Sequence, residues 1–280
     1  VEVQRTLSAD NLYKGDDLYV ELLVTNRSRR KTQQLEVYDN VPHEMKLRSG
    51  LNQMRLNLKP GESARIRYVL RCPLRGHYSI GPVSLRYRNT FNLSVDEMYV
   101  DHHSDIIIFP QIRDVEEAFI RSRTAKMYTG ATTLRTPGPG TEFYSLREYV
   151  PGDPFKNINW KAFARTGDLM INEKCRDAVT DLYIILDSRD IARIGTVLKN
   201  PLEMGTVAAA SLASFFIKRR DSVSLTIYDE KLSFLPPDTG DKQYFKILSS
   251  LAGVAPRGTM PLQAVTNSLA ARFSRGSPVF

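Results

Sequence analysis

The first hundred residues alternate apolar and polar side chains with the two-residue period of a β-strand. Leu18, Val20, Leu22 and Val24 occupy every second position, which places them on one face of an extended chain. Six more segments have the same character, namely residues 35–38, 54–58, 64–70, 78–87, 98–100 and 106–109. Turn-forming residues separate them, and none has a helical period. The pattern predicts an antiparallel, Ig-like β-sandwich over residues 1–112.

The periodicity changes after Pro110. Apolar residues within 114–126 recur at helical spacing, so we expect a helix there. The stretch 130–140 is rich in Thr, Pro and Gly and is expected to form a loop. We therefore assign residues 113–176 to a linker segment between two domains.

From residue 181 the chain alternates strand and helix patterns. Residues 182–186 form an apolar run ending at Asp187, which is typical of a parallel strand covered on both faces. Asn200, Pro201 and Glu203 have the order of an N-cap and a first helical turn. A hairpin over 222–235, helices over 243–251 and 261–273, and a strand start at 278–280 follow. Residues 177–280 are thus predicted to form a doubly wound α/β domain, truncated at its C-terminal end.

Composition fits two soluble domains, because single cores rarely grow beyond ~250–300 residues and the chain has 280. The net charge of +8 is spread over all three segments rather than gathered in a basic arm, which argues against nucleic acid as the partner. The apolar stretch 207–217 is shorter than the ~20 residues that span a bilayer. Because the sequence opens at Val1 and stops at Phe280 within a predicted strand, we expect it to be a piece of a longer protein.

The middle of the chain carries a run of specifically spaced residues. They are Gly138, Gly140, Glu142, Phe143, Arg147, Tyr149, Gly152, Asp153, Ile158, Trp160, Ala164 and Arg165. This run resembles the signature of the family called domain of unknown function 58. Residues 75–82 and 88–93 resemble segments of that family's sandwich region.

The resemblance implies an architecture and a set of partners. It implies a sandwich followed by a von Willebrand factor type A-like domain, both solvent-exposed and cytoplasmic, on a protein anchored in the membrane by N-terminal helices. Relatives often accompany MoxR-type AAA+ ATPases. We expect such an ATPase to be the partner.

A type A domain holds Mg²⁺ with oxygens from three loops, and this sequence departs from that pattern. Asp187 matches the first ligand and Thr259 resembles the second-loop threonine, but Arg189 and Ile191 replace two serines. Too few oxygens remain for an octahedral ion, although Ser188 and Asp190 could supply substitutes. We predict a degenerate site without metal or cofactor. In the structural alternative, Asp187 and Thr259 cap secondary structure.

The signature residues Glu142, Arg147, Asp153 and Arg165 include acids and bases, but no nucleophile is spaced next to a base. Arginine–carboxylate pairs that fix a loop, or contacts with a partner, explain them better than catalysis. Phe143, Tyr149 and Gly152 belong to the same set. Trp160, the single tryptophan, is expected to be buried as a core anchor against the α/β domain.

These observations favour a protein-interaction or adaptor module over an enzyme. We expect it to work with a MoxR-type AAA+ ATPase in protein assembly or quality control. Two alternatives remain open. One is a metal-dependent hydrolase using Asp187, Asp190 and Glu142, and the other is a protein that binds an anionic membrane surface or nucleic acid through its dispersed positive charge.

Overall fold

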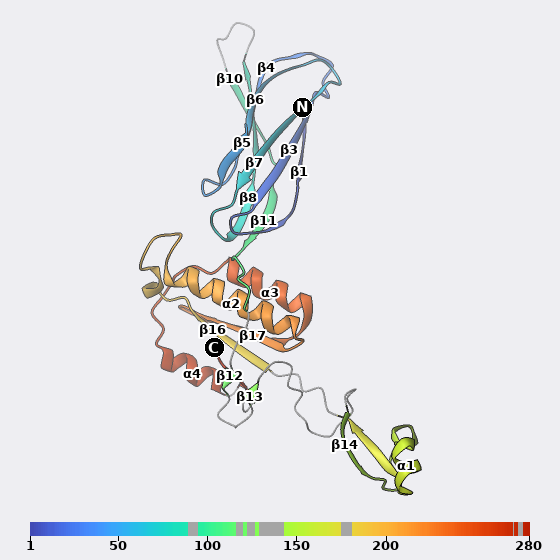
Figure 1. The fold of residues 1–280 in the computed structure, drawn as a ribbon. Coiled ribbons are helices and arrows are strands. Elements are labelled where there is room, and N and C mark those ends of the chain that lie inside the picture. Colours follow the sequence, from blue (N-terminus) through green and yellow to red (C-terminus); the bar gives the residue numbers. More distant parts are fainter. Residues whose placement is uncertain are drawn as a thin grey trace.

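The structure is a computed structural model that describes residues 1–88, 95–115, 120–121, 127–128, 143–174, 181–270, 272–273 and 277–280. Strands alone build the N-terminal part, and strands with helices build the C-terminal part (Figure 1). Within these ranges, no helix has both the length and the apolar character needed to cross a bilayer.

Two four-stranded antiparallel sheets form the N-terminal sandwich. Their strand orders are β1-β3-β7-β5 and β10-β9-β4-β6. The bounds are β1 (Glu2–Leu7), β3 (Asp17–Thr25), β4 (Thr32–Asp39), β5 (Lys46–Gly50), β6 (Gln53–Leu58), β7 (Ser63–Arg71), β9 (Val83–Arg88) and β10 (Val95–Val100). Alternate residues such as Leu22, Ile66 and Leu85 are buried in one shared core. The predicted β-sandwich is therefore confirmed in outline.

A third, smaller sheet lies at the end of the sandwich nearest the helices (Figure 1). It has the order β2-β11-β8, with β2 (Asn11–Tyr13), β8 (Gly76–Ile80) and β11 (Ser104–Phe109). The prediction of a single strand over 78–87 is wrong, because β8 and β9 belong to different sheets. Gly81 stands between them with φ +122°, and a Cβ there would lie 2.3 Å from the His102 carbonyl oxygen. Only glycine fits this turn.

The helix predicted over 114–126 is wrong where the structure describes this segment. Strand β12 (Ile120–Arg121) pairs antiparallel with β13 (Met127–Tyr128). Short apolar runs satisfy both strand and helix patterns, so periodicity alone did not separate them. Residues 116–119 and 122–126 lie outside the described residues.

Residues 143–174 form a small unit that stands away from the sheet containing β16 (Figure 1). Strands β14 (Phe143–Glu148) and β15 (Met170–Lys174) pair antiparallel. Between them lie the 3-10 helix η1 (Phe155–Asn157) and helix α1 (Trp160–Thr166). The Asn159 side chain accepts a hydrogen bond from the Ala162 N–H and caps α1.

The C-terminal unit is a three-layered α/β structure. Strands β16 (Asp181–Asp187) and β17 (Ser222–Tyr228) are parallel, and β18 (Leu232–Asp238) pairs antiparallel with β17. A parallel bridge between Tyr183 and Val279 adds the C-terminal end to this sheet. Helices α2 (Pro201–Lys218) and α3 (Gly240–Ala252) pack on one face and α4 (Leu262–Ala270) on the other (Figure 1). The predicted alternation of strands and helices is confirmed.

Local sequence explains how α2 begins and where it packs. The Asn200 side chain accepts the Glu203 N–H at 2.8 Å, and Pro201 occupies the first turn, as predicted. Gly205 faces β16 so closely that a Cβ would lie 2.8 Å from the Leu186 side chain. Apolar side chains of α2 and α3 then share one core with alternate residues of β16 and β17. Phe109, the last residue of β11, is buried in this same core.

Buried charges join the sandwich to the α/β unit. The Arg75 side chain is only 6% exposed and lies 2.8 Å from Glu203, which also pairs with Lys14 at 2.6 Å. One Arg75 Nη donates to three carbonyl oxygens at the end of α3, those of Leu251, Ala252 and Val254. Burial lowers the Arg75 pKa, and Glu203 opposes that shift. Both helices are thus tied to the sandwich.

Candidate functional site

The carboxyl end of β16 carries an aspartate whose two oxygens are both engaged. Arg189 donates from Nε to Asp187 Oδ1 at 3.0 Å and from Nη2 to Oδ2 at 2.7 Å. The Arg189 backbone N–H adds a bond to Oδ1 at 3.0 Å. A bidentate guanidinium–carboxylate pair of this kind fixes both partners in one geometry.

The neighbouring strand supports this pair. Tyr228 ends β17 opposite Asp187, and the Arg189 guanidinium lies 5.4 Å from its ring centroid. Arg189 lowers the pKa of Asp187 by hydrogen bonding, and Asp187 raises the pKa of Arg189. Burial, followed by Asp187, raises the pKa of Tyr228. The pair stays partly open to solvent, with side chains 27% and 36% exposed.

The residues at this end of the sheet do not fit a Mg²⁺ site. Asp187 is held by Arg189, and the fully buried Ser188 hydroxyl donates to the Tyr228 carbonyl oxygen at 3.0 Å. The Asp190 carboxylate pairs with the Arg193 guanidinium, with Nη2 and Oδ1 3.4 Å apart. Thr259 is exposed, and within the described ranges no three His, Cys, Asp or Glu side chains gather. The structure thus brings Asp187 and Arg189 together, while Ser188 and Asp190 bond to other groups.

The loop that follows Asp187 exposes large apolar side chains. We call Ile191, Ile194, Val197, Leu198 and Met204 the apolar edge; they are between 52% and 73% exposed. The sequence patterns did not predict this surface. Its signal was four large aliphatic residues within 191–198, outside any strand or helix pattern.

Hydrogen bonds hold this loop in place. The Asp190 N–H donates to the Gly258 carbonyl oxygen at 3.0 Å, and Arg193 Nη2 donates to the Pro256 carbonyl oxygen at 3.1 Å. Thr196 and Lys199 exchange two backbone bonds of 3.0 Å. Four residues of the apolar edge are therefore presented by an anchored loop, and the fifth, Met204, lies in the first turn of α2.

The signature residues form ion pairs around a tight turn. Arg147 donates to both oxygens of Asp153 at 2.7 Å and to Glu173 on β15 at 2.8 Å. Asp153 also accepts the Val150 N–H at 3.0 Å, and the hydrogen bonds from Arg147 and Val150 lower its pKa to about 2. Arg147 and Asp153 thus hold the turn between them together, as a partly exposed pair rather than the buried one expected.

Other signature residues have separate positions. Tyr149 stacks on Phe155 with ring centroids 6.0 Å apart, and Gly152 takes φ +112° in the turn. Phe143 and Arg165 are exposed. Glu142 lies outside the described residues, so its place relative to Asp187 stays a prediction.

The expectation that Trp160 is a buried core anchor is wrong. Its side chain is 61% exposed and meets Phe163 edge-on, with centroids 6.3 Å apart. Helix α1 has two turns and its unit has one two-stranded sheet, which is too little structure to enclose an indole. The described residues of this unit also do not pack against the sheet that contains β16, contrary to the expectation (Figure 1).

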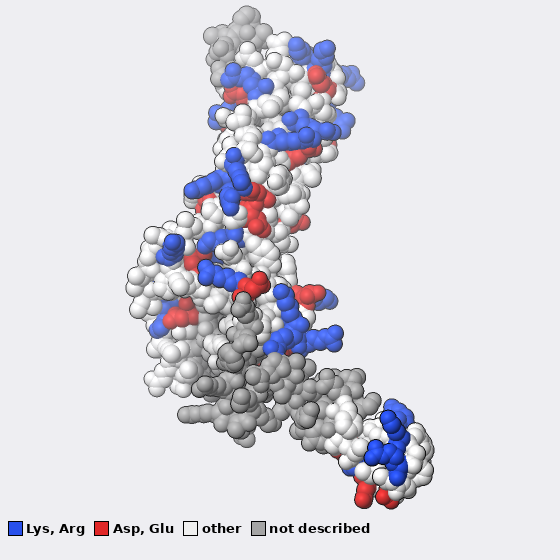
Figure 2. Space-filling view, viewed as in Figure 1, with Lys and Arg blue, Asp and Glu red and all other residues white. Residues whose placement is uncertain are grey.

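Charge on the visible face of the molecule is mixed. Figure 2 shows Lys and Arg interspersed with Asp and Glu from the sandwich to the small unit, without one continuous basic surface. This agrees with the even spread of charge along the sequence.

Part of the chain is similar to known proteins. Residues 145–280 match the model of a family described as protein of unknown function DUF58. Uncharacterised proteins of Mycobacterium tuberculosis and Mycobacterium bovis are 28% identical over 76 residues, which is 27% of this chain and 24% of theirs. The match thus spans about a quarter of the length of these curated relatives.

Solved structures resemble the chain only weakly. A FixG-related protein from Vibrio parahaemolyticus has a TM-score of 0.25 at 13% identity, covering 38% of this chain and 94% of that protein. Salmonella alpha-2-macroglobulin has a TM-score of 0.32 at 22% identity, covering 40% of this chain and 7% of that protein. TM-scores this low carry no inference about function.

Proposed function

We propose that this chain is a protein-interaction module, built from an Ig-like sandwich and a von Willebrand factor type A-like domain. The observation that carries the proposal is the apolar edge beside the Arg189–Asp187 pair. In support of a type A-like domain, Asp187 ends the first strand of a sheet that has parallel strands and helices on both faces.

The chemistry of this end of the sheet favours a protein partner. Open α/β sheets bind ligands at the carboxyl ends of their strands. Here the carboxylate is neutralised by a guanidinium of its own loop, and the neighbouring side chains are aliphatic and exposed. Clustered exposed apolar groups gain free energy when another protein surface covers them. A small polar substrate would leave them in water.

The partner we propose is a MoxR-type AAA+ ATPase, acting with this chain in protein assembly or quality control. The support is the resemblance of residues 138–165 to the signature of domain of unknown function 58, together with the family match over residues 145–280. On the same resemblance we propose that the whole protein is anchored in the membrane, with these domains in the cytoplasm. The binding surface is thus proposed from the geometry, and the identity of the partner from the resemblance.

The test combines two substitutions in the apolar edge. The purified chain and the MoxR-type ATPase of the same organism are mixed, and binding is followed by biolayer interferometry with and without ATP. Ile194→Asp with Val197→Asp should weaken binding by about tenfold or more, because charges enter the centre of the interface. Leu51→Asp, an exposed leucine of the sandwich, is the matched control and should bind normally. Equal binding of both variants, or none by the unaltered chain, contradicts the proposal.

A metal-dependent hydrolase is the rival, and the site geometry argues against it. Asp187 and Asp190 each face an arginine of their own loop. Isothermal titration with Mg²⁺ and Mn²⁺ should show no specific binding at Asp187. Micromolar binding that Asp187→Ala abolishes would favour the hydrolase over the interaction module.

A further inference from the structure

The outward face of one sandwich sheet carries several positive charges. The outward residues of β3, β5 and β7 include five cations, Lys46, Arg48, Arg65, Arg67 and Arg71, against two carboxylates, Asp17 and Glu21. Asp17 meets Arg48 and, at 3.9 Å, Arg71. Glu21 meets Arg67 at 2.5 Å and Arg65 at 3.8 Å. We call these seven residues the basic face.

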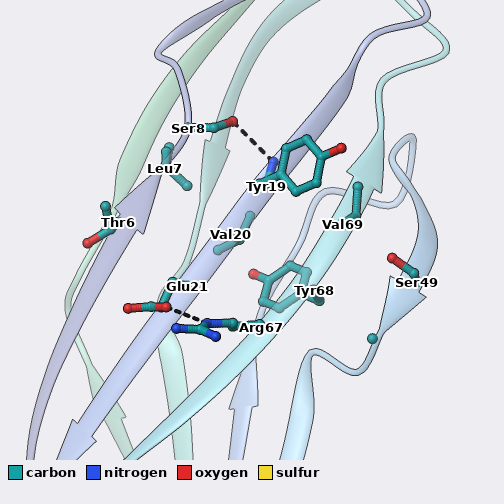
Figure 3. Close-up of a pocket in the computed structure, with 11 residues that line it drawn as sticks. Thr6, Leu7, Ser8, Tyr19, Val20, Glu21, Ser49, Arg67, Tyr68 and Val69 are labelled. Carbon is teal, nitrogen blue, oxygen red and sulfur yellow. Dashed lines mark hydrogen bonds and ion pairs between the residues drawn. The ribbon is translucent and has the colours of Figure 1, made fainter.

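A hollow on this sheet is lined by residues of β1, β3, β5 and β7, among them Glu21 and Arg67 of the basic face (Figure 3). It has a volume of about 480 Å³. Tyr19 and Val69 stand opposite each other across β3 and β7 in its lining, and Tyr19 is 61% exposed. Ser8 lies on one side of them and Ser49 on the other in Figure 3. The centre is therefore apolar, while its two flanks are short polar groups.

Strand register places the charges at regular intervals around this hollow. Asp17 pairs with Arg71, Tyr19 with Val69, and Glu21 with Arg67, two residues apart on each strand. At about 3.3 Å per residue, successive rungs are about 7 Å apart. A rung that sets an arginine opposite a carboxylate thus lies on either side of the apolar rung.

We infer that the basic face binds an extended acidic segment of a partner protein. An apolar side chain of that segment enters the hollow over Tyr19 and Val69. Carboxylates two residues before and after it reach the arginines of the flanking rungs, since an extended peptide has the same ~7 Å repeat. Each guanidinium has five N–H donors, so it can hold Asp17 or Glu21 and a second carboxylate together.

This occupant explains the surface better than its rivals. The phosphates of a nucleic acid backbone or of lipid headgroups would be attracted by the cations but would not fill the apolar hollow. The inference concerns a different surface from the apolar edge, so either can fail without the other.

The experiment uses a fluorescein-labelled peptide with a Glu-Thr-Leu-Thr-Glu core and the whole chain, followed by anisotropy at low and physiological salt. The unaltered chain should bind it, more weakly as salt rises, and a peptide with Lys in place of Glu should not bind. Arg67→Glu and Tyr19→Ala should each weaken binding by about tenfold. The Ile194→Asp, Val197→Asp chain should bind normally.

Arg55→Glu is the matched control, because Arg55 also bridges strands to a glutamate, Glu36, but on the other sheet. It should leave binding unchanged, and circular dichroism should show all variants folded. Equal loss in Arg55→Glu and Arg67→Glu would overturn the proposal. So would binding to phosphatidylserine vesicles without binding to the peptide.

Discussion

Two arginine–aspartate pairs, one inside the sandwich and one at the edge of the α/β sheet, have the same chemistry and different surroundings. Arg5 and Asp39 have side chains that are 0% exposed, whereas Arg189 and Asp187 stay partly in water. Both pairs use two guanidinium nitrogens on two carboxylate oxygens. The two pairs differ in burial and in the partners that surround them.

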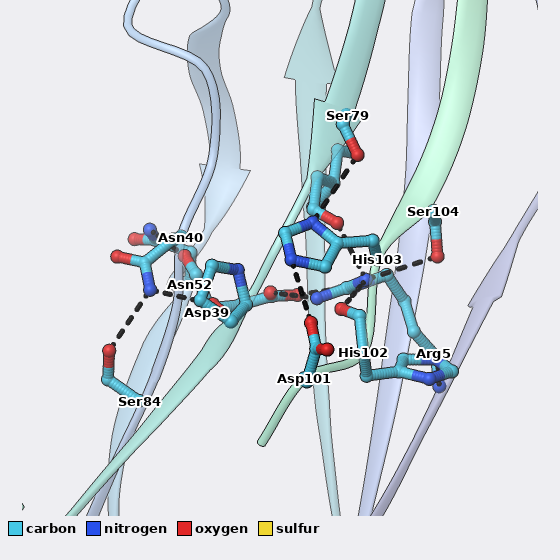
Figure 4. A network of polar contacts seen from close by, with 12 residues as sticks. Arg5, Asp39, Asn40, Asn52, Ser79, Ser84, Asp101, His102, His103 and Ser104 are labelled. Atoms are coloured by element: carbon cyan, nitrogen blue, oxygen red, sulfur yellow. Dashed lines mark hydrogen bonds and ion pairs between the residues drawn. The ribbon is translucent and has the colours of Figure 1, made fainter. Parts of the chain in front are cut away.

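The buried pair is completed by further partners (Figure 4). Arg5 also donates to the carbonyl oxygens of Ile80 and His102 and to the Ser104 hydroxyl, and Asp39 accepts the Tyr68 hydroxyl. These bonds join strands of different sheets. A buried ion pair whose polar atoms all have partners fixes one arrangement of the core, while removal of either partner leaves an uncompensated charge. The edge pair lacks this enclosure and leaves its surface available for recognition.

The largest expected effect is at the buried pair. Asp39→Ala leaves the Arg5 cation in the sandwich without its counter-ion and should lower the free energy of unfolding by about 3–5 kcal/mol. Urea unfolding followed by circular dichroism measures it. Glu36→Ala on the same strand removes an exposed pair with Arg55 and should cost less than about 1 kcal/mol. Equal losses of unfolding free energy in Asp39→Ala and Glu36→Ala would show that burial does not make the Arg5–Asp39 pair more important than the exposed one.

The next effect is at the junction of the two regions. Arg75→Ala removes the guanidinium from the end of α3 and leaves Glu203 buried with Lys14 alone. It should cost about 2–4 kcal/mol and expose the junction to limited proteolysis. Arg86→Ala, which breaks an exposed pair with Glu97, is the control. Unchanged unfolding and proteolysis of Arg75→Ala would contradict a buried junction.

A smaller effect is expected at Trp160. Because its side chain is mostly in water, Trp160→Ala should change the free energy of unfolding by less than about 1 kcal/mol. Phe216→Ala, in the α/β core, should cost about 3–5 kcal/mol. Acrylamide should quench the native tryptophan fluorescence readily. A strongly protected indole would show that Trp160 is buried after all.

The smallest effect is on the titration of Asp187. Arg189 holds the Asp187 pKa below its ordinary value, which is about 3.9. A lowered native pKa stabilises the fold above the unfolded pKa, and this contribution is lost as pH falls through the native value. In carbon-detected NMR, Arg189→Ala should move the midpoint upward, while Arg193→Ala should leave it unchanged. An unmoved midpoint in Arg189→Ala would mean that the pair does not form in solution.

The sequence by itself determined the elements whose causes are local. The alternation of apolar and polar residues predicted strands such as β3 and β7. Asn200 and Pro201 predicted the start of α2. Both signals act within a few residues of the chain. The sequence also indicated that Asp187 lacks the hydroxyl neighbours of a metal site. It did not distinguish one strand from two across Gly81, nor strand from helix at Ile120.

Only the tertiary structure decided which distant residues meet. Arg5 and Asp39 are 34 positions apart, and the register of β3 on β7 decides that Tyr19 faces Val69 between two arginine rungs. Among the residues that the structure describes, none encloses Trp160, which is 61% exposed, and its apolar character does not reveal this. The apolar edge becomes a surface only when its loop is bonded to residues 256–258. Burial and strand register depend on contacts between distant parts of the chain, so a local sequence pattern does not predict them.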